Sequence, residues 1–386
     1  MRLAIITTHP IQYYAPVFKI LNEAQQINIK VFYTWGQKSV EKFDPGFGIN
    51  VDWDIPLLRG YDHEWVKNTS TDPGSHHFKG IINPELIDRV NTWQPDAILI
   101  FGWAYHSHLK AIRYFKNRVP IYFRGDSTLL DVQKGFKALL RSVFLRWVYR
   151  YIDYAFYVGA NNKAYFKKYG LKDEQLSFAP HAVDNDRFTA DRTDEALKLR
   201  QSIGISADDV LILFAGKLEQ KKSPLLLLDA FLALGKPNIH LLFVGNGIME
   251  VPIKTGSSNH KNIHFIDFQN QSKMPAVYQA SDLFCLPSKG PGETWGLAVN
   301  EAMAAGKPVL ASDQVGCAID LVVPSFTGYI FESENLSDIT EKLRLLTKDK
   351  SRLKTLGMNA KNKIAEWSFD NQVSAILTKI KENHAS

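Results

Sequence analysis

The chain has 386 residues, of which 45% are hydrophobic and 22% charged, a composition typical of a globular protein whose two halves can each bury a core. Because no run of about 18 uncharged apolar residues occurs and the first residues lack a leader pattern, we expect neither a membrane-spanning helix nor a signal peptide. Its two cysteines have no metal or redox spacing, so we expect small core residues in a cytoplasmic protein.

The excess of positive charge lies in the first half of the chain. The formal net charge is +6, and residues 1–188 contain 24 Lys or Arg and 18 Asp or Glu, which leaves 22 of each for the remainder. Residues 101–150 alone have 10 basic and 2 acidic side chains. Such a patch usually faces a membrane surface, phosphates or nucleic acid, and a solvated helix face is the alternative.

In chain order, apolar strand-like runs alternate with helix-like stretches. Predicted strands in the first half are residues 3–8, 29–34, 97–101, 121–124 and 155–158. In the second half they are residues 210–215, 240–244, 263–265, 283–286, 309–311 and 328–331, with amphipathic stretches at 229–234, 274–280 and 336–347. Apolar strands separated by helices predict two parallel sheets covered on both faces, hence two Rossmann-like domains. The polar run 184–194 is the predicted linker.

Ligands of open parallel sheets bind beyond the carboxyl ends of the strands. The segment after the strand 283–286 has residues that suit such a ligand. A Gly- and Pro-rich loop follows the strand 283–286, and a helix is expected from about residue 296 to 305. Backbone N–H groups of Trp295, Gly296 and Leu297 would form an anion seat at the helix start. Glu301 could accept bonds from two ribose hydroxyls and Glu293 from sugar hydroxyls. Alternatively, these are one exposed and one capping glutamate.

This segment, with ETWGL from Glu293 and EAMA from Glu301, resembles the retaining glycosyltransferases of family 4, which have the GT-B fold and a Glu-x7-Glu motif. The resemblance implies an α/β protein of two Rossmann-like, doubly wound domains facing a central cleft. It also implies a nucleotide-diphosphate sugar donor, transfer with retention, Glu293 on the donor sugar and Glu301 on the ribose. The loop amides of Trp295, Gly296 and Leu297 would hold the diphosphate or the sugar.

A second block follows the strand 210–215, where Gly216-Lys217 and then Lys222 precede a helix beginning near Pro224. Two cations there could neutralise a diphosphate leaving group, so we expect Lys217 and Lys222 to be catalytic and no metal or other cofactor to be needed. A solvated turn is the alternative. The resembled family usually has Arg in place of Lys217 and Gly in place of Ser223.

Glycine turns complete the predicted nucleotide site. Gly245 follows the strand 240–244 in a Gly-x-Gly turn that resembles the family, and Gly216 ends the strand 210–215. We expect both to lie beside the nucleotide.

The first half departs from the family. Its first loop, HPIQYY from His9, is not glycine-rich, and Arg124-Gly-Asp126 stands where many members have a His-Asp pair. We expect Asp126 to be catalytic, bonding the donor sugar or the acceptor hydroxyl. Arg124 would pair with an acidic acceptor or bridge to Asp126. A histidine, His106 or His108, would line the site or be structural.

The basic segment 134–151 is predicted to form an amphipathic helix. Its apolar face would contain Phe136, Leu140, Val143, Trp147 and Tyr151, flanked by basic residues. An anionic membrane surface or a lipid-linked acceptor would suit this face, as would the core of the first domain.

Together these features predict a metal-independent, hexosyltransferase-type glycosyltransferase of cell-surface polysaccharide or glycoconjugate synthesis. Residues 1–188 would form the acceptor domain, residues 189–366 the nucleotide-sugar domain, and residues 367–386 a helix returning to the first. The acceptor would be a glycan, a lipid-linked or a small molecule. We expect no nucleic-acid partner. The basic segment 134–151 further predicts peripheral attachment to the inner face of the plasma membrane. Alternatives are a nucleotide-sugar epimerase or phosphorylase of the same fold, or a non-catalytic accessory subunit.

Overall fold

The computed structural model describes residues 1–37, 42–44, 46–131 and 135–384. The chain divides into two compact units. Unit 1 contains residues 1–42, 55–181 and 369–386, and unit 2 contains residues 43–54 and 182–368. The chain therefore passes from one unit to the other four times, because the short segment 43–54 belongs to unit 2 although it lies early in the sequence.

Unit 1 is built on a parallel sheet with the strand order β5-β2-β1-β6-β7-β8-β9. The strands are β1 (Arg2–Thr7), β2 (Asn28–Tyr33), β5 (Asp62–Trp65), β6 (Ala97–Phe101), β7 (Ile121–Arg124), β8 (Tyr154–Tyr157) and β9 (Leu176–Phe178). The central strands are almost wholly apolar and buried, as expected where helices cover both faces.

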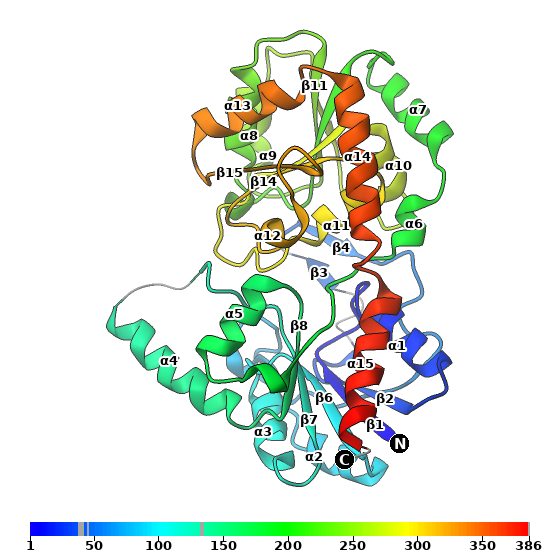
Figure 1. Ribbon diagram of the computed structural model, residues 1–386, viewed down its shortest axis with the longest axis vertical. Coiled ribbons are helices and arrows are strands. Elements are labelled where there is room, and N and C mark those ends of the chain that lie inside the picture. The colour runs from blue at the N-terminus through cyan, green and yellow to red at the C-terminus, as the bar shows by residue number, and fades with distance from the viewer. Residues whose placement is uncertain (38–41, 45, 132–134, 385–386) are drawn as a thin grey trace. The chain divides into compact units, whose positions relative to one another are not determined.

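Helices lie on both faces of this sheet (Figure 1). One face carries α1 (Ala15–Glu23) and α15 (Phe369–His384), which pack together. The core of the other face includes residues of α2 (Leu86–Trp93), α3 (His106–Phe115), α4 (Phe136–Tyr149) and α5 (Ala160–Lys168). The short helices η2 (Phe78–Gly80) and η3 (Asp173–Gln175) complete the unit. Buried Val373, Ile376 and Ile380 of α15 therefore belong to the core of the first unit.

Unit 2 has a second parallel sheet, with the order β12-β11-β10-β13-β14-β15. Its strands are β10 (Val210–Ala215), β11 (Ile239–Val244), β12 (Ile263–Ile266), β13 (Leu283–Leu286), β14 (Val309–Ser312) and β15 (Gly328–Phe331). The segment 43–54 contributes the two-stranded sheet of β3 (Lys42–Asp44) and β4 (Ile49–Val51).

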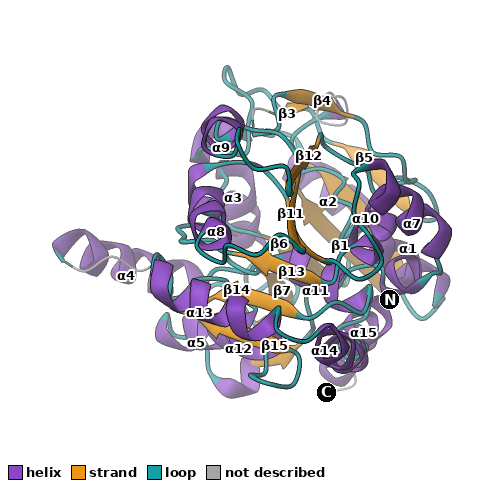
Figure 2. Ribbon diagram, turned by 90° about the horizontal axis from the view of Figure 1, so that it is seen from above, coloured by secondary structure: helices purple, strands orange, loops and turns teal. Residues whose placement is uncertain are grey.

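The helices of unit 2 cover both faces of its sheet. They are α6 (Asn185–Thr189), α7 (Thr193–Ser202), η4 (Gln220–Lys222), α8 (Pro224–Leu232), α9 (Glu250–Gly256), α10 (Met274–Ala280), α11 (Leu297–Ala304), α12 (Ala318–Leu321), α13 (Leu336–Leu346) and α14 (Lys350–Ile364). Figure 1 and Figure 2 both show α8 on one side of the sheet and α10 on the other. Both cysteines are free and buried in this unit.

The predicted pair of parallel α/β sheets is confirmed, and each predicted strand is present within a residue or so of its bounds. The predicted linker 184–194 is wrong. Asp184 caps α6 by accepting the backbone N–H of Arg187, so the polar residues there are helix-capping and helix-surface groups. The strands β5 and β9 were not predicted, because they are short edge strands without an apolar run.

The helix α4 projects from unit 1 in both views (Figure 1 and Figure 2). Its C-terminal half is anchored in the core by Leu145, Val148 and Tyr149. Five large apolar side chains on the rest of the helix are instead exposed: Phe136 (73%), Leu139 (61%), Leu140 (55%), Val143 (62%) and Phe144 (40%). Lys134, the first residue of the predicted segment, lies outside the described residues. Within the described residues, no helix is both long and apolar enough to span a membrane.

Candidate functional site

The loop between β13 and α11 in unit 2 is fixed by backbone bonds to the segment before α12. The N–H of Gly316 donates to the carbonyl of Glu293 (3.0 Å), and the N–H of Cys317 donates to the carbonyl of Trp295 (2.9 Å). A third backbone bond joins the N–H of Lys289 to the carbonyl of Lys221 (2.8 Å), which ties this loop to η4. The structure thereby brings the Glu293 loop and the Lys222 turn together, although they are 71 residues apart in the sequence.

Glu293 is the centre of a buried polar cluster. Its Oε2 contacts the ammonium group of Lys222 and accepts a hydrogen bond from Ser288 Oγ at 2.8 Å. The side chains of Glu293 and Lys222 are only 8% and 17% exposed. Because two partners hold a largely desolvated carboxylate, the orientation of the Glu293 side chain is fixed.

Lys217 follows β10 directly, and its ammonium group lies 5.1 Å from the ring centre of Phe47. Phe47 also contacts Phe268 (4.7 Å between ring centres), which follows β12. Phe47 comes from the segment 43–54, whose Asp54 accepts the backbone N–H of Ser272 at 3.2 Å. Phe47, which is distant in the sequence, therefore lies over Lys217, the lysine predicted to neutralise the diphosphate in the same unit.

Gly216 and Gly245 are positioned by the close approach of two strand ends. The N–H of Gly216 donates to the carbonyl of Val244 (3.0 Å), which continues the β10–β11 ladder. A Cβ atom added at Gly245 would lie 2.2 Å from the carbonyl oxygen of Gly216, so no other residue fits there without moving the backbone. These glycines shape the turn that carries Lys217, and the structure shows no further role for them.

The start of α11 contains the other predicted loop residues. Gly296 precedes the helix with φ +94°, a left-handed conformation that favours glycine, and Leu297 is its first residue. A Cβ atom at Gly296 would lie 2.8 Å from Val315 Cγ1 and 3.7 Å from Glu293 Oε1. Trp295 is buried, and its indole N–H donates to Asn300 Oδ1 at 2.9 Å. The Trp295 side chain thus anchors the turn, whereas the first N–H groups of α11 lack acceptors within the helix.

Glu301, one turn into α11, is 4% exposed. Its Oε2 accepts a hydrogen bond from the hydroxyl group of Tyr278 on α10 at 2.8 Å. This contact orients the buried carboxylate. Tyr278 is a positioning residue that the sequence did not reveal, because nothing in its motif links it to Glu301.

Asp126 lies in unit 1, after β7, and is partly exposed. Its charge acts on three neighbouring side chains. Burial first, and then Asp126, raises the pKa of Tyr14 and of Tyr105 above the ordinary value for tyrosine. Asp126 therefore stands among two phenol groups and the guanidinium group of Arg124 in this unit.

Arg124 does not have the accessible position expected of it. It is 1% exposed and donates to the carbonyls of Ala179 (2.9 Å) and Pro180 (3.0 Å). Burial lowers the pKa of Arg124 to about 10, and nearby Tyr14 and Asp126 oppose that change. The guanidinium group therefore holds the chain segment after β9, and the prediction that it would pair with an acidic acceptor is corrected.

The two histidines after β6 differ. His108 is fully buried, with Nδ1 3.0 Å from the carbonyl of Gly102 and Nε2 2.8 Å from Thr34 Oγ1. Burial lowers its pKa to about 4, so it is neutral at physiological pH and structural. His106 is exposed in the first turn of α3. The described metal-ligand side chains that cluster are instead Asp72, His76 and His77 of unit 1.

Comparison with known proteins places these features in context. Residues 196–363 match the family described as Glycosyl transferases group 1. A D-inositol 3-phosphate glycosyltransferase of Gordonia bronchialis is 26% identical over 226 residues, covering 54% of this chain and 48% of that protein. The sulfoquinovosyl transferase SQD2 of Arabidopsis thaliana is 23% identical over 322 residues, covering 79% and 59% respectively. The chain thus spans about half the length of the curated relatives it matches.

The fold extends over the whole chain. The crystal structure of Anabaena HepE in complex with UDP and glucose aligns with a TM-score of 0.71 and 19% identity, covering 100% of this chain and 99% of that one. The predicted GT-B arrangement of two Rossmann-like domains is therefore confirmed as a fold. The matched region contains all the predicted donor-site residues, whereas Asp126, Arg124 and the two histidines lie outside it.

Proposed function

We propose that this chain transfers a sugar from a nucleoside-diphosphate donor to an acceptor, with retention of anomeric configuration. The similarity to GT-B glycosyltransferases described above supports the proposal. The observation that carries the proposal is the buried Lys222–Glu293–Ser288 cluster within the segment that matches the glycosyl transferases. A fixed cation and a fixed carboxylate, side by side, suit a diphosphate next to a polyhydroxylated ring. Sugar transfer is the simplest chemistry that uses both.

In the proposed donor complex, Lys222 and Lys217 neutralise the diphosphate, and the first N–H groups of α11 add partial positive charge. Glu293, through the oxygen nearer Gly296, accepts hydroxyl groups of the sugar. Glu301, oriented by Tyr278, accepts the ribose hydroxyls and thereby selects a ribonucleotide. No metal is required in this scheme, because the lysines carry the countercharge.

The proposed reaction replaces one bond to the anomeric carbon by another and moves one proton. The acceptor hydroxyl oxygen bonds to the anomeric carbon on the face from which the diphosphate oxygen departs. The acceptor's proton passes to the departing phosphate, so charge and protons balance. Asp126 of unit 1 is the proposed group that orients the acceptor hydroxyl. Retention follows from attack and departure on one face of the sugar.

A screen of nucleotide sugars tests the donor assignment. UDP-glucose is the first probe, because UDP and glucose are bound in the HepE structure. We expect one nucleotide sugar to raise the melting temperature, and Glu301→Ala to lower donor turnover about tenfold or more, ~1.4 kcal/mol. Release of nucleoside diphosphate that depends on an added acceptor supports transfer. Donor interconversion without release would instead indicate an epimerase, and binding without turnover an accessory subunit.

We further propose that the acceptor belongs to cell-surface polysaccharide or glycoconjugate synthesis and that the protein is a cytoplasmic enzyme that attaches peripherally to an anionic membrane. The five exposed apolar side chains of α4 support attachment, since soluble proteins seldom expose such a group on one helix. Lys137, Arg141, Arg146 and Arg150 are exposed on the same segment. Apolar insertion with basic flanks is the pattern of helices that lie in an anionic interface.

The predicted apolar face of this helix is partly corrected. Phe136, Leu140 and Val143 are exposed as expected, whereas Trp147 stacks on Phe144 (5.7 Å between ring centres) beneath the guanidinium group of Arg113. The exposed apolar surface therefore lies nearer the start of α4 than the sequence indicated.

Co-sedimentation with vesicles separates attachment from simple exposure. We expect binding to phosphatidylglycerol-containing vesicles and little to phosphatidylcholine alone. Lys137→Glu with Arg141→Glu should abolish it, whereas the same charge change on α5, Lys167→Glu with Lys168→Glu, should not. Equal loss of vesicle binding in the two double variants would show that net charge alone controls binding. No loss of binding in either variant would exclude α4 as the docking element.

A further inference from the structure

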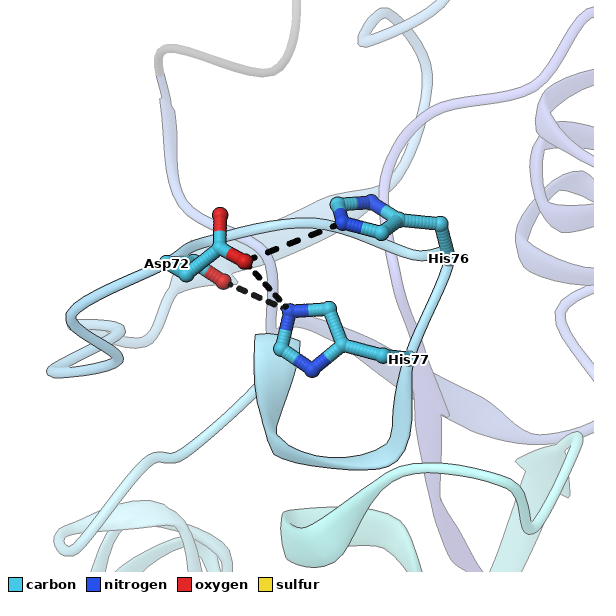
Figure 3. Close-up of side chains that lie close together, drawn as sticks. All are labelled: Asp72, His76 and His77. Atoms are coloured by element: carbon cyan, nitrogen blue, oxygen red, sulfur yellow. Dashed lines mark hydrogen bonds and ion pairs between the residues drawn. The ribbon is translucent and has the colours of Figure 1, made fainter.

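Three ligand-type side chains of unit 1 converge in the loop between β5 and α2 (Figure 3). His77 Nε2 lies 3.2 Å and His76 Nε2 lies 3.9 Å from the same oxygen, Oδ2 of Asp72. The backbone carbonyl of Asp72 is also 3.0 Å from His77 Nε2. For zinc bonds of about 2.0–2.1 Å, the edges of a ligand tetrahedron are about 3.3 Å long. The observed spacing is therefore close to that of a metal site.

The loop that carries these ligands is held by bonds that do not involve them. Asn68 Oδ1 accepts the N–H groups of Ser70 (3.1 Å) and Ile82 (2.9 Å), and Asn68 Nδ2 donates to the carbonyl of Gly80 (2.9 Å). Ser70 Oγ donates to the carbonyl of Lys79 at 2.7 Å. The two ends of the loop are thus clamped together, so the loop loses little conformational freedom when a metal binds.

We propose that Asp72, His76 and His77 bind a divalent transition metal, with Zn²⁺ as the favoured ion. Two imidazole nitrogens and one carboxylate form a ligand set that zinc prefers, and that hard cations such as Mg²⁺ do not. Asp72 and His76 are 74% and 68% exposed, so the remaining coordination position faces solvent and takes water or an anionic group.

The site lies beside the proposed acceptor residues of the same unit. The hydroxyl group of Tyr105 donates to the carbonyl of Ser75 at 3.3 Å, and Tyr105 is one of the phenols that Asp126 influences. A bound metal would hold the 72–77 loop against Tyr105. The binding itself does not depend on sugar transfer, and it can be measured without donor or acceptor.

Titration of the full, untagged chain with Zn²⁺ against a chromophoric chelator tests the proposal. We expect one tightly bound ion per chain and at least a tenfold loss of affinity in His76→Ala and in His77→Ala. His260→Ala, which removes an exposed histidine of unit 2, is the matched control and should leave that ion in place. Co²⁺ bound at the site should give the strong visible absorption of a tetrahedral complex.

Hydrogen exchange supplies a second readout. Zn²⁺ should slow amide exchange in residues 69–80 of the wild type but not of His77→Ala. Binding of equal affinity in both histidine variants, or of an ion that His260→Ala removes, would overturn the assignment. So would Co²⁺ spectra that do not change in His76→Ala.

Discussion

At the candidate site of unit 2, buried charged side chains bond to other side chains, whereas near Asp126 in unit 1 the buried Arg124 and His108 bond mostly to the backbone. Lys222 and Glu293 form an ion pair, and Glu301 is fixed by the Tyr278 hydroxyl. Arg124 instead holds two carbonyls, and His108 contacts two more. Loss of one member of a buried ion pair leaves a desolvated charge, and loss of a buried donor leaves backbone carbonyls unpaired. The contrast therefore separates side chains that hold one another, at the proposed donor site, from architectural side chains that hold the backbone.

The largest expected effect is in unit 2. Lys222→Ala should lower donor turnover about a hundredfold or more, ~2.7 kcal/mol, because it removes a fixed cation from the leaving diphosphate. Steady-state release of nucleoside diphosphate measures it.

The neighbouring residue provides the control for this variant. Lys221 sits on the same turn but is 40% exposed and pairs with Glu219 at 3.3 Å. Lys221→Ala should keep near-normal turnover. Equal loss of activity in both variants would show that turnover depends on positive charge anywhere on this turn. That result would contradict the proposed role of the buried Lys222–Glu293 pair.

The same contrast between the two units explains which parts of the fold and of the candidate site could be predicted from the sequence. The strands could be predicted from their apolar runs, and the glutamate and lysine motifs of unit 2 from the family pattern that they resemble. Phe47 and Tyr278 could not, since they reach Lys217 and Glu301 only through folding. In unit 1, Arg124 beside Asp126 suggested a site, and only burial showed that its guanidinium group serves the backbone.

The second prediction tests unit 1 with two residues that are close in sequence. Arg124→Met should lower the free energy of unfolding by about 2 kcal/mol, because it leaves two buried carbonyls without their donor. Asp126→Asn should change stability by less than about 0.5 kcal/mol, since the side chain is partly exposed.

Activity should show the reverse pattern for Asp126. We expect Asp126→Asn to lower transfer to the acceptor about tenfold, with donor affinity unchanged. Denaturant unfolding and donor titration measure the two quantities. A large loss of stability in Asp126→Asn would place this residue with the architectural group and remove it from the proposed site.

The third prediction concerns acid. Burial lowers the pKa of His108 to about 4 in the folded protein, whereas an unfolded histidine titrates near 6.5. Above about pH 6.5 both states are neutral at this group, and as the pH falls toward 4 only the unfolded state takes up the proton. Folding stability should therefore fall by about 2 kcal/mol from this residue between pH 6.5 and 4.5.

A variant isolates the contribution of this histidine. His108→Gln should be less stable than the wild type at pH 7 but lose less stability between pH 6.5 and 4.5, as measured by denaturant unfolding. His260→Gln, at an exposed position, should keep the wild-type slope. Parallel pH profiles for the wild type and His108→Gln would contradict the structural role of a buried neutral imidazole.

The smallest expected effect tests a departure from the resembled family in unit 2. Ser223 has φ +48° and ψ +45°, a left-handed conformation at the start of α8, where the family usually has glycine. A side chain costs about 1–2 kcal/mol in that region, while glycine costs up to about 1 kcal/mol in unfolded-chain entropy. Ser223→Gly should therefore stabilise the protein by about 0.5 kcal/mol, seen as a small rise in the denaturant midpoint.

Ser374→Gly, within the helix α15, should lower the midpoint, because glycine is unfavourable in a helix interior. A fall in both variants would mean that the serine side chain supports the Lys222 turn, and that unit 2 depends on this residue as well as on its backbone.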